Sequence, residues 1–258
     1  MVGIQKAAQI GFSSQAGTYA KGRPSYPIEL QAWLRNKLGI DSESTVIDLG
    51  AGTGKFTRLL NSITRDVVAI EPVEAMRAEF SKALPDLSIL NGTAECIPVD
   101  SSTAEAVVCA QAFHWFASES ALAEIHRVLK PGGRLGMIWN VRDESVDWVA
   151  AITDIMTPYE GDTPRFHTGL WRAPFSGPHF SEPQMTCFKY VHSGSPQEVI
   201  LDRFLSVSFI AALPPADKAN VTEQLHALIA THPSLKGREI IEFPYQTQAY
   251  LCHRINSE

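Results

Sequence analysis

The stretch DLGAGTGKFT, residues 48–57, decides the fold of this chain. It follows the apolar run STVIDL (44–49) and opens the amphipathic pattern KFTRLLNSI (55–63). A strand, a glycine-rich turn and a helix in this order are typical of an α/β protein that binds a ligand at the end of its first strand. The spacing of the glycines then indicates whether this ligand is a mononucleotide, a dinucleotide or a molecule without phosphate groups.

Two phosphate-binding loops do not fit this spacing. A mononucleotide P-loop aligned on Gly54 places Leu49 where its first glycine is required and Phe56 where its magnesium-binding hydroxyl is required. A dinucleotide loop of the GxGxxG type places Lys55 where its third glycine is required. The "GK" of this stretch is therefore interpreted as a coincidence.

The pattern that remains is an acidic residue followed by alternate glycines: Asp48, Gly50, Gly52 and Gly54. Alternate glycines allow a sharp turn whose backbone comes within contact distance of a ligand that carries no phosphate. A carboxylate at the end of the strand suits a ligand with an ammonium group. The alternative is that Asp48 only caps the following helix.

Residues 44–140 alternate β-rich runs with three helical patterns. The apolar positions of the β-rich runs are continuous, which is typical of strands covered on both faces by helices. Such alternation predicts an α/β fold with a doubly wound, mainly parallel sheet. The expected strands are STVIDL (44–49), DVVAIE (66–71), LSILNG (87–92), AEAVVCA (104–110) and RLGMIWN (134–140).

The pattern loosens after Asn140. Residues 158–184 are rich in proline and aromatic residues and indicate an irregular or partly helical segment. Two further strands, 185–193 and 242–255, bring the expected sheet to seven, the last of them antiparallel. Helical stretches at 196–212 and 215–231 suggest a helical lid. We expect one domain over 1–258, with an N-terminal cap (1–43), a ligand-binding core (44–140) and covering insertions (141–184 and 195–238).

Composition and charge restrict the partners. The chain has 258 residues, of which 45% are hydrophobic and 19% charged, and its net charge of −6 gives no general attraction to nucleic acid or an anionic membrane. The four cysteines form no CxxC pair and the eight histidines show no metal-ligand spacing, so we expect no metal site. We expect no signal peptide and no membrane span, because residues 1–14 lack a charged segment followed by an apolar one and no apolar run approaches about 18 residues. We expect a cytoplasmic monomer or weak homodimer.

Four motifs between residues 44 and 140 resemble those of the class I S-adenosylmethionine-dependent methyltransferases. VIDLGAGTGKFTRLL (46–60) resembles the first motif, and LKPGGRLGMIW (129–139) resembles the turn and fifth strand. Glu71 stands 23 positions after Asp48, where the family has the acid that holds the ribose hydroxyls. NGTAECIP (91–98) resembles the adenine-binding loop, although Thr93 replaces the usual aspartate.

This resemblance implies S-adenosylmethionine as the cofactor. It also implies a set of cofactor-binding residues in the loops at the strand ends. A narrower resemblance, to the trans-aconitate and fungal thiol methyltransferases, is carried by YAKGRPSYP (19–27), AQAFHWF (110–116) and YQTQAYLCHR (245–254). There Tyr19 and Arg23 would close over the methionine end of the cofactor. The remaining cofactor-binding residues would be Asp48, Gly50, Ala51, Gly52, Glu71, Pro72, Met76, Ala94, Glu95 and Gln111.

The acceptor site is expected at the ends of the fourth and fifth strands. The stretch AQAFHWF (110–116) is rich in aromatic residues, which favours a bulky or aromatic small molecule. His114 is the candidate general base, needed only for a hydroxyl acceptor; a carboxylate or acidic thiol arrives ionised, and the histidine is then a wall of the pocket. The expected substrate-binding residues are Phe113, His114, Trp115, Trp139, Asn140 and Trp171.

The predicted activity is in-line methyl transfer from S-adenosylmethionine to a small thiol, carboxylate or hydroxyl compound. An RNA or protein methyltransferase is the enzymatic alternative, and the acidic composition and the absence of an NPPY-type tetrad argue against nucleic acid. A catalytically silent protein that binds the cofactor and acts through a partner is the third possibility.

Overall fold

The structure, a computed structural model, describes residues 23–256. The chain forms two compact units. Unit 1 comprises the described residues 23–25, 140–163 and 189–246, and unit 2 comprises 26–139, 164–188 and 247–256. The division of a single domain into cap, core and insertions stays a prediction.

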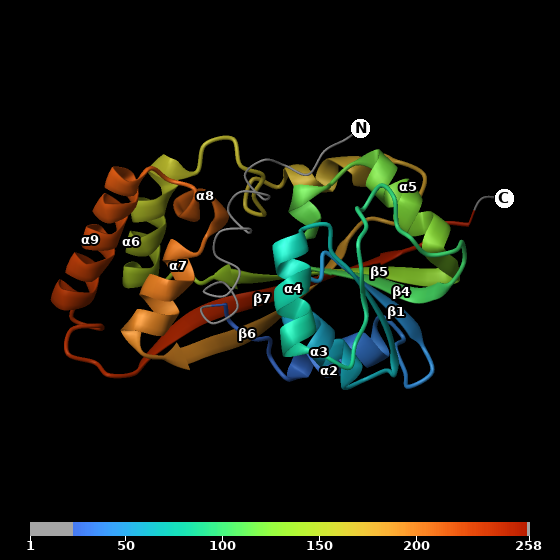
Figure 1. Cartoon of the computed structure of the whole chain (residues 1–258), viewed down its shortest axis with the longest axis horizontal. Coiled ribbons are helices and arrows are strands. Elements are labelled where there is room, and N and C mark those ends of the chain that lie inside the picture. Colours follow the sequence, from blue (N-terminus) through green and yellow to red (C-terminus); the bar gives the residue numbers. More distant parts are fainter. Residues whose placement is uncertain (1–22, 257–258) are drawn as a thin grey trace. The chain divides into compact units, whose positions relative to one another are not determined.

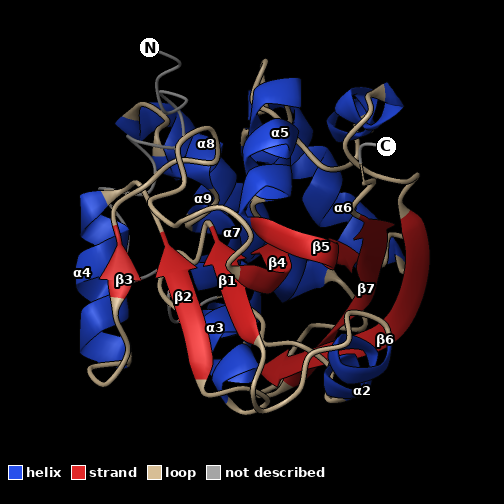
Figure 2. Cartoon of the chain, turned by 90° about the vertical axis from the view of Figure 1, so that its right-hand side faces the viewer, coloured by secondary structure: helices blue, strands red, loops and turns tan. Residues whose placement is uncertain are grey.

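One seven-stranded sheet runs through the fold in the order β3-β2-β1-β4-β5-β7-β6 (Figures 1 and 2). β5, β6 and β7 each contribute residues to both units. The predicted seven-stranded α/β sheet is confirmed. The strands are β1 (Thr45–Leu49), β2 (Asp66–Ile70), β3 (Ile89–Leu90), β4 (Ala104–Ala110), β5 (Leu129–Arg142), β6 (Gln184–Gly194) and β7 (Ile241–His253).

The pairing is parallel from β3 to β5, and β7 is reversed. Asp48 of β1 pairs with Ala69 of β2 and with Val108 of β4, so the carboxyl ends of these strands meet at one edge. Arg254 donates its backbone N–H to the Gly133 carbonyl in unit 2, and Asp143 donates to the Pro244 carbonyl in unit 1. Later residues of β7 therefore face earlier residues of β5, which is antiparallel pairing.

The helices of unit 2 bury one apolar stripe each. In α2 (Glu29–Asn36) the buried residues Leu30, Trp33 and Leu34 recur at the spacing of a helix face. α5 (Glu119–Val128) is capped at its N-terminus by Ser118, whose hydroxyl accepts the Ala121 N–H at 3.2 Å. Figure 2 shows α4 beside β3 at the edge of the sheet. The other helices of unit 2 are α3 (Lys55–Asn61), α4 (Glu74–Ala83) and the 3₁₀ helices η1 (Phe113–Trp115) and η3 (Leu170–Ser176).

Unit 1 has its own hydrophobic core. Trp148, Val149 and Ile152 of α6 (Asp147–Met156) pack there with apolar residues of the other helices and with Phe243 and Tyr245 of β7. α6 and α9 lie side by side (Figure 1). The remaining helices are η2 (Thr157–Tyr159), the π-helix η4 (Gln197–Asp202), α7 (Arg203–Leu205), α8 (Ser208–Ala211) and α9 (Pro215–Thr231).

Four parts of the chain differ from the expectations. β5 begins at Leu129 and not at residue 134, because Leu129 already pairs with Ala104 of β4. The next residue to pair is Arg134, which lies opposite Ala106, and the residues between Leu129 and Arg134 form a bulge. The helical stretch expected at 196–212 is divided into η4, α7 and α8. Helices α2 and α6 were not predicted at all.

Among residues 23–256, no helix has the length and apolar character needed to cross a membrane. The same residues contain no group of three or more His, Cys, Asp or Glu side chains arranged to hold a metal ion.

Candidate active site

The turn between β1 and α3 contains glycines with two different functions. Gly50, Gly52 and Gly54 have positive φ angles of 77°, 57° and 84°. A Cβ at Gly50 would lie 2.7 Å from the Ala112 Cβ, and one at Gly54 would lie 2.6 Å from Leu84. A Cβ at Gly52 would meet no atom within 4 Å. Packing explains the outer two glycines, whereas the space in front of Gly52 suits a ligand.

Asp48 is fully buried at the end of β1. Its Oδ2 accepts the Thr57 hydroxyl at 2.6 Å, and its Oδ1 has no hydrogen-bond partner among the described residues. Burial raises the pKa of Asp48 from 3.8 to about 7, while the Thr57 hydroxyl opposes this rise and the charge of Glu71 adds to it. An unpaired, buried carboxylate oxygen is costly, and a cationic group at this oxygen would compensate that cost.

Glu71 follows β2 and holds the glycine turn. Its Oε2 accepts the Gly52 N–H at 3.0 Å and its Oε1 accepts the Val73 N–H at 2.9 Å. Burial raises its pKa, and the same two N–H groups oppose that rise. The Gly50 N–H also donates to the Ile70 carbonyl at 2.9 Å, so the turn is tied to the end of β2.

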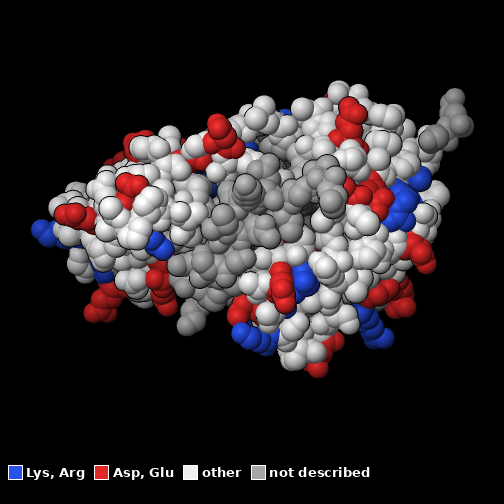
Figure 3. Space-filling view, turned by 45° about the horizontal axis from the view of Figure 1, so that its top comes forward, with Lys and Arg blue, Asp and Glu red and all other residues white. Residues whose placement is uncertain are grey.

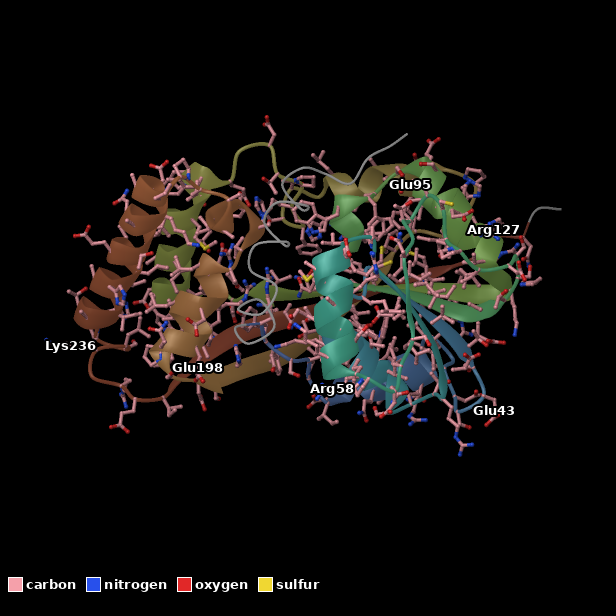
Figure 4. The ribbon with its side chains drawn as sticks, viewed as in Figure 1. Glu43, Arg58, Glu95, Arg127, Glu198 and Lys236 are labelled. Carbon is pink, nitrogen blue, oxygen red and sulfur yellow. The ribbon has the colours of Figure 1, made fainter. Side chains whose placement is uncertain are left out.

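The other expected cofactor-binding residues of unit 2 follow the ends of β1 to β4, on the connecting loops or, for Met76, in the first turn of α4. Gln111 has a φ of 58°, rare for a residue with a side chain, and donates its N–H to the Ile138 carbonyl at 2.7 Å. Glu95 lies on the loop between β3 and β4 (Figure 4). Ala51, Met76 and Ala94 are buried, and Pro72 is half-buried. Cofactor contact by these residues stays a prediction.

An aromatic cluster adjoins the ends of β4 and β5 in unit 2. Trp139 lies 4.8 Å from Trp171 and 4.7 Å from Phe166, measured between ring centroids, and Trp171 lies 4.9 Å from Tyr250. Phe113, Trp139 and Trp171 are at most 2% exposed, so they form the interior of the cluster. We call Phe113, Trp139, Phe166, Trp171, Phe175 and Tyr250 the aromatic cluster.

His114 and Trp115 lie at the half-buried border of this cluster. The indole Nε1–H of Trp139 donates to His114 Nδ1 at 3.0 Å. An indole nitrogen can only donate, so Nδ1 is the unprotonated nitrogen and the proton of the neutral imidazole lies on Nε2.

Comparison with known proteins identifies the family. Residues 47–137 match the family described as a methyltransferase domain. The chain is 35% identical over 242 residues to an uncharacterized methyltransferase-like protein of Schizosaccharomyces pombe, with 93% of both chains covered. It is 38% identical over 238 residues to an uncharacterized methyltransferase of Mycobacterium tuberculosis, which covers 92% of this chain and 93% of the relative. The chain belongs to the class I S-adenosylmethionine-dependent methyltransferases.

Solved structures agree with this methyltransferase in fold. A protein named as a type II methyltransferase from Anaeromyxobacter dehalogenans is 22% identical, with a TM-score of 0.58 over 90% of this chain and 96% of that chain. The YcgJ protein of Bacillus subtilis is 16% identical, with a TM-score of 0.55 over 88% of this chain and 98% of that chain.

The β1–α3 turn of the methyltransferase fits S-adenosylmethionine, the cofactor of the family. Asp48 Oδ1 would accept from an ammonium group, and the space before Gly52 would admit the ligand against the backbone. Each carboxylate oxygen of Glu71 accepts one N–H and keeps a lone pair for a ribose hydroxyl. When bound, the cofactor supplies an electrophilic methyl group on a positively charged sulfur.

Two expected site residues lie outside unit 2. Arg23 and Asn140 belong to unit 1, where the Asn140 amide donates to the Ser25 carbonyl at 2.8 Å. Tyr19 lies outside the described residues. The roles of Tyr19, Arg23 and Asn140 stay predictions.

Two residues of the methyltransferase site were missed by sequence reasoning. Thr57 holds Asp48 through its hydroxyl, and a hydroxyl on the first turn after the glycine loop was the available signal. Tyr250 joins the aromatic cluster and accepts from Arg172 at 3.2 Å. The sequence indicates only that Tyr250 is an aromatic residue in the last strand, and aromatic residues are common in buried strands of any function.

We predict that Glu71→Ala weakens cofactor binding by about 1–3 kcal/mol, because charge-assisted hydrogen bonds to the ribose and to the turn are lost. Isothermal titration calorimetry measures the change. Glu74→Ala, which removes an exposed carboxylate from the same segment, is the control and should bind like the parent protein. Equal affinity of Glu71→Ala and the parent protein would show that the second strand end is wrongly assigned.

Proposed function

We propose that this methyltransferase methylates a small organic molecule that arrives already ionised, namely a carboxylic acid or an acidic thiol. The observation that carries the proposal is the hydrogen bond from Trp139 Nε1 to His114 Nδ1. A neutral His114 held in this way presents Nε2 as a donor, and a donor cannot take a proton from a hydroxyl acceptor. Protonation of Nδ1 would require the loss of the Trp139 hydrogen bond.

The aromatic cluster supports a small acceptor with an apolar or aromatic body. Binding sites for small organic molecules are lined mainly by apolar and aromatic side chains with a few polar groups. Trp115 and Phe116 are half-buried next to the buried ring of Phe113, which lies 5.5 Å from Phe116. Half-buried rings of this kind offer contact area at the border of a rigid cluster.

The charge distribution gives no support to a nucleic-acid substrate. On the face shown in Figure 3, the described Lys and Arg side chains are scattered among Asp and Glu side chains. Proteins that bind RNA concentrate basic side chains in a patch or stripe.

In the proposed reaction the chain orients its reactants and keeps them from water. The acceptor's anion attacks the methyl carbon in line with the bond to sulfur, and this bond breaks as the new one forms. The half-buried rings at the border of the aromatic cluster would orient the acceptor. No proton has to leave during the attack, because the acceptor is already ionised.

A panel of acceptors tests the proposal. Carboxylic acids, thiols, phenols and amines are each incubated with the protein and cofactor, and the release of demethylated cofactor is measured. Turnover with an acid or an acidic thiol is expected. Turnover confined to phenols, alcohols or amines would contradict the proposal.

We predict that His114→Gln lowers kcat by less than about tenfold with the best acceptor, against the 10²–10⁴-fold typical of a lost general base. The profile of kcat/KM against pH should follow the ionisation of the acceptor and should be shared by the parent protein and the variant. His226→Gln, which removes an exposed histidine, is the control. A loss of about 100-fold, together with loss of the parent pH profile, would show that His114 is the base.

A further inference from the structure

Arg203 is a buried cation of unit 1 that has no ion-pair partner among residues 23–256. Its side chain is 9% exposed, and neither Nε nor Nη1 has a hydrogen-bond partner among the described residues. Its Cζ lies 5.2 Å from the ring centroid of Phe204, which solvates a guanidinium only weakly. Buried guanidinium groups in proteins are normally paired, so these donors indicate a missing acceptor.

The carboxylates nearest in the chain are engaged elsewhere. Asp202 accepts from Gln197 Nε2 at 2.7 Å, and Glu198 (Figure 4) accepts from the Ser195 hydroxyl at 2.9 Å. No ion pair within the described part of the chain involves Arg203. The acceptor that Arg203 lacks is therefore not supplied by these acidic side chains.

A second unpaired donor lies in the same core. The hydroxyl of Tyr245 is buried and has no hydrogen-bond partner among residues 23–256. The ring centroid of Tyr245 lies 4.8 Å from that of Phe243 in a stacked arrangement, and the centroid of Phe243 lies 5.4 Å from that of Phe204. The Arg203 guanidinium lies over the Phe204 ring. The rings of Tyr245, Phe243 and Phe204 thus form a continuous row between the Tyr245 hydroxyl and the Arg203 guanidinium.

Arg142 adds positive charge to this group. The hydrogen bond from Asp143 to Pro244 places Arg142 opposite Tyr245, on the same face of the β5–β7 pair. Its Cζ lies 5.7 Å from the Phe204 ring, and its Nε lies 3.7 Å from Glu144. Arg142 and Arg203 therefore flank one aromatic ring, and only Arg142 has a carboxylate beside it.

The backbone at Arg203 is also specialised. Arg203 follows directly on the π-helix η4, and single π-helical turns are rare and are often found at functional sites.

We propose that unit 1 binds the carboxylate of an organic acid, with Arg203 Nε–H and Nη1–H and the Tyr245 hydroxyl as donors. A carboxylate matches the planar guanidinium, and Phe204 and Phe243 provide an apolar wall for the rest of the molecule. The site and its donors belong to unit 1 alone, and the site does not depend on the proposed function.

Benzoate tests the site without cofactor and without catalysis. Isothermal titration calorimetry and thermal unfolding are measured with benzoate, with the neutral benzamide and with inorganic phosphate. We expect benzoate to bind and to raise the unfolding temperature, and benzamide to do neither. Absence of benzoate binding, or a response to phosphate alone, would overturn the assignment to organic acids.

Variants then locate the bound anion. We expect Arg203→Met to weaken benzoate binding by about 30-fold or more and Tyr245→Phe by about 3- to 10-fold. Lys236→Met removes an exposed cation from the same unit and should bind benzoate like the parent protein. Arg203→Lys keeps the charge but loses the planar donor pair, and it serves if Arg203→Met does not fold. Parent-like binding by the folded Arg203 variant would overturn the proposal.

The benzoate experiment and the acceptor panel can contradict the anion site and the proposed function separately. Benzoate binding through Arg203 with no turnover of acids or thiols would preserve the anion site and contradict the proposed function. Turnover of acids without benzoate binding would contradict the anion site alone.

Discussion

Gly52→Val is expected to remove S-adenosylmethionine binding, with a loss of at least about 100-fold in affinity, equivalent to about 3 kcal/mol. Two methyl groups would occupy the space in front of Gly52, where an added Cβ meets nothing within 4 Å. The variant would also strain the turn, because valine rarely adopts a φ near 57°. Calorimetric titration measures the affinity, and thermal unfolding measures the strain.

Gly161→Val separates these two effects. Gly161 has a φ of 54° and the same open surroundings, but it lies in unit 1, outside the β1–α3 turn. Both variants should lose similar stability, and only Gly52→Val should lose the cofactor. If Gly52→Val binds as tightly as Gly161→Val, the turn is not the cofactor site.

Asp48→Asn is expected to stabilise the ligand-free protein at about pH 8 by as much as about 4 kcal/mol and to weaken cofactor binding. Between about pH 4 and 7 the folded protein keeps a proton on Asp48 that the unfolded chain has released. The folded-state pKa is raised, so rising pH lowers the free energy of unfolding through this window. The asparagine variant lacks that decline, because its amide does not titrate.

Cofactor affinity should respond to Asp48 in the opposite direction. The charged carboxylate would bind the ammonium group through Oδ1, so affinity in the parent protein should rise as pH increases towards about 7, and Asp48→Asn should lose about 1.5–3 kcal/mol. Asp86→Asn, which neutralises an exposed carboxylate, is the control for both measurements. A variant that is less stable than the parent at pH 8, yet binds the cofactor equally well, would assign Asp48 a purely structural role.

The fold was predictable because its signals are local. Continuous apolar runs marked β1, β2 and β4, and the glycine turn fixed the point at which the first strand ends. α6 was missed because its buried residues, such as Trp148 and Ile152, follow a loop and precede a proline-rich segment that obscures the helical pattern. The π-helix η4 has no signal in the sequence, since it depends on how Arg203 and its neighbours pack.

The candidate site was predictable only to the level of motifs. Three alternate glycines look equivalent in the sequence, and only the surroundings of each Cα distinguish Gly52 from Gly50 and Gly54. The tautomer of His114 depends on Trp139, which is 25 residues away in the chain and adjacent through the β4–β5 pair. The unpaired donors of Arg203 likewise reflect which acceptors are absent around a folded side chain, and no pattern of residues encodes an absence.

Transfer of labelled methyl groups tests the central claim most directly. The protein is incubated with S-adenosylmethionine labelled at the methyl group and with an extract that contains metabolites, RNA and proteins, and the three fractions are then separated and counted. Gly52→Val provides the background. We predict that the label accumulates in the small-molecule fraction, in a methyl ester or methyl thioether. Label confined to RNA or protein, or label at the level of the Gly52→Val background in all fractions, would contradict small-molecule methyl transfer.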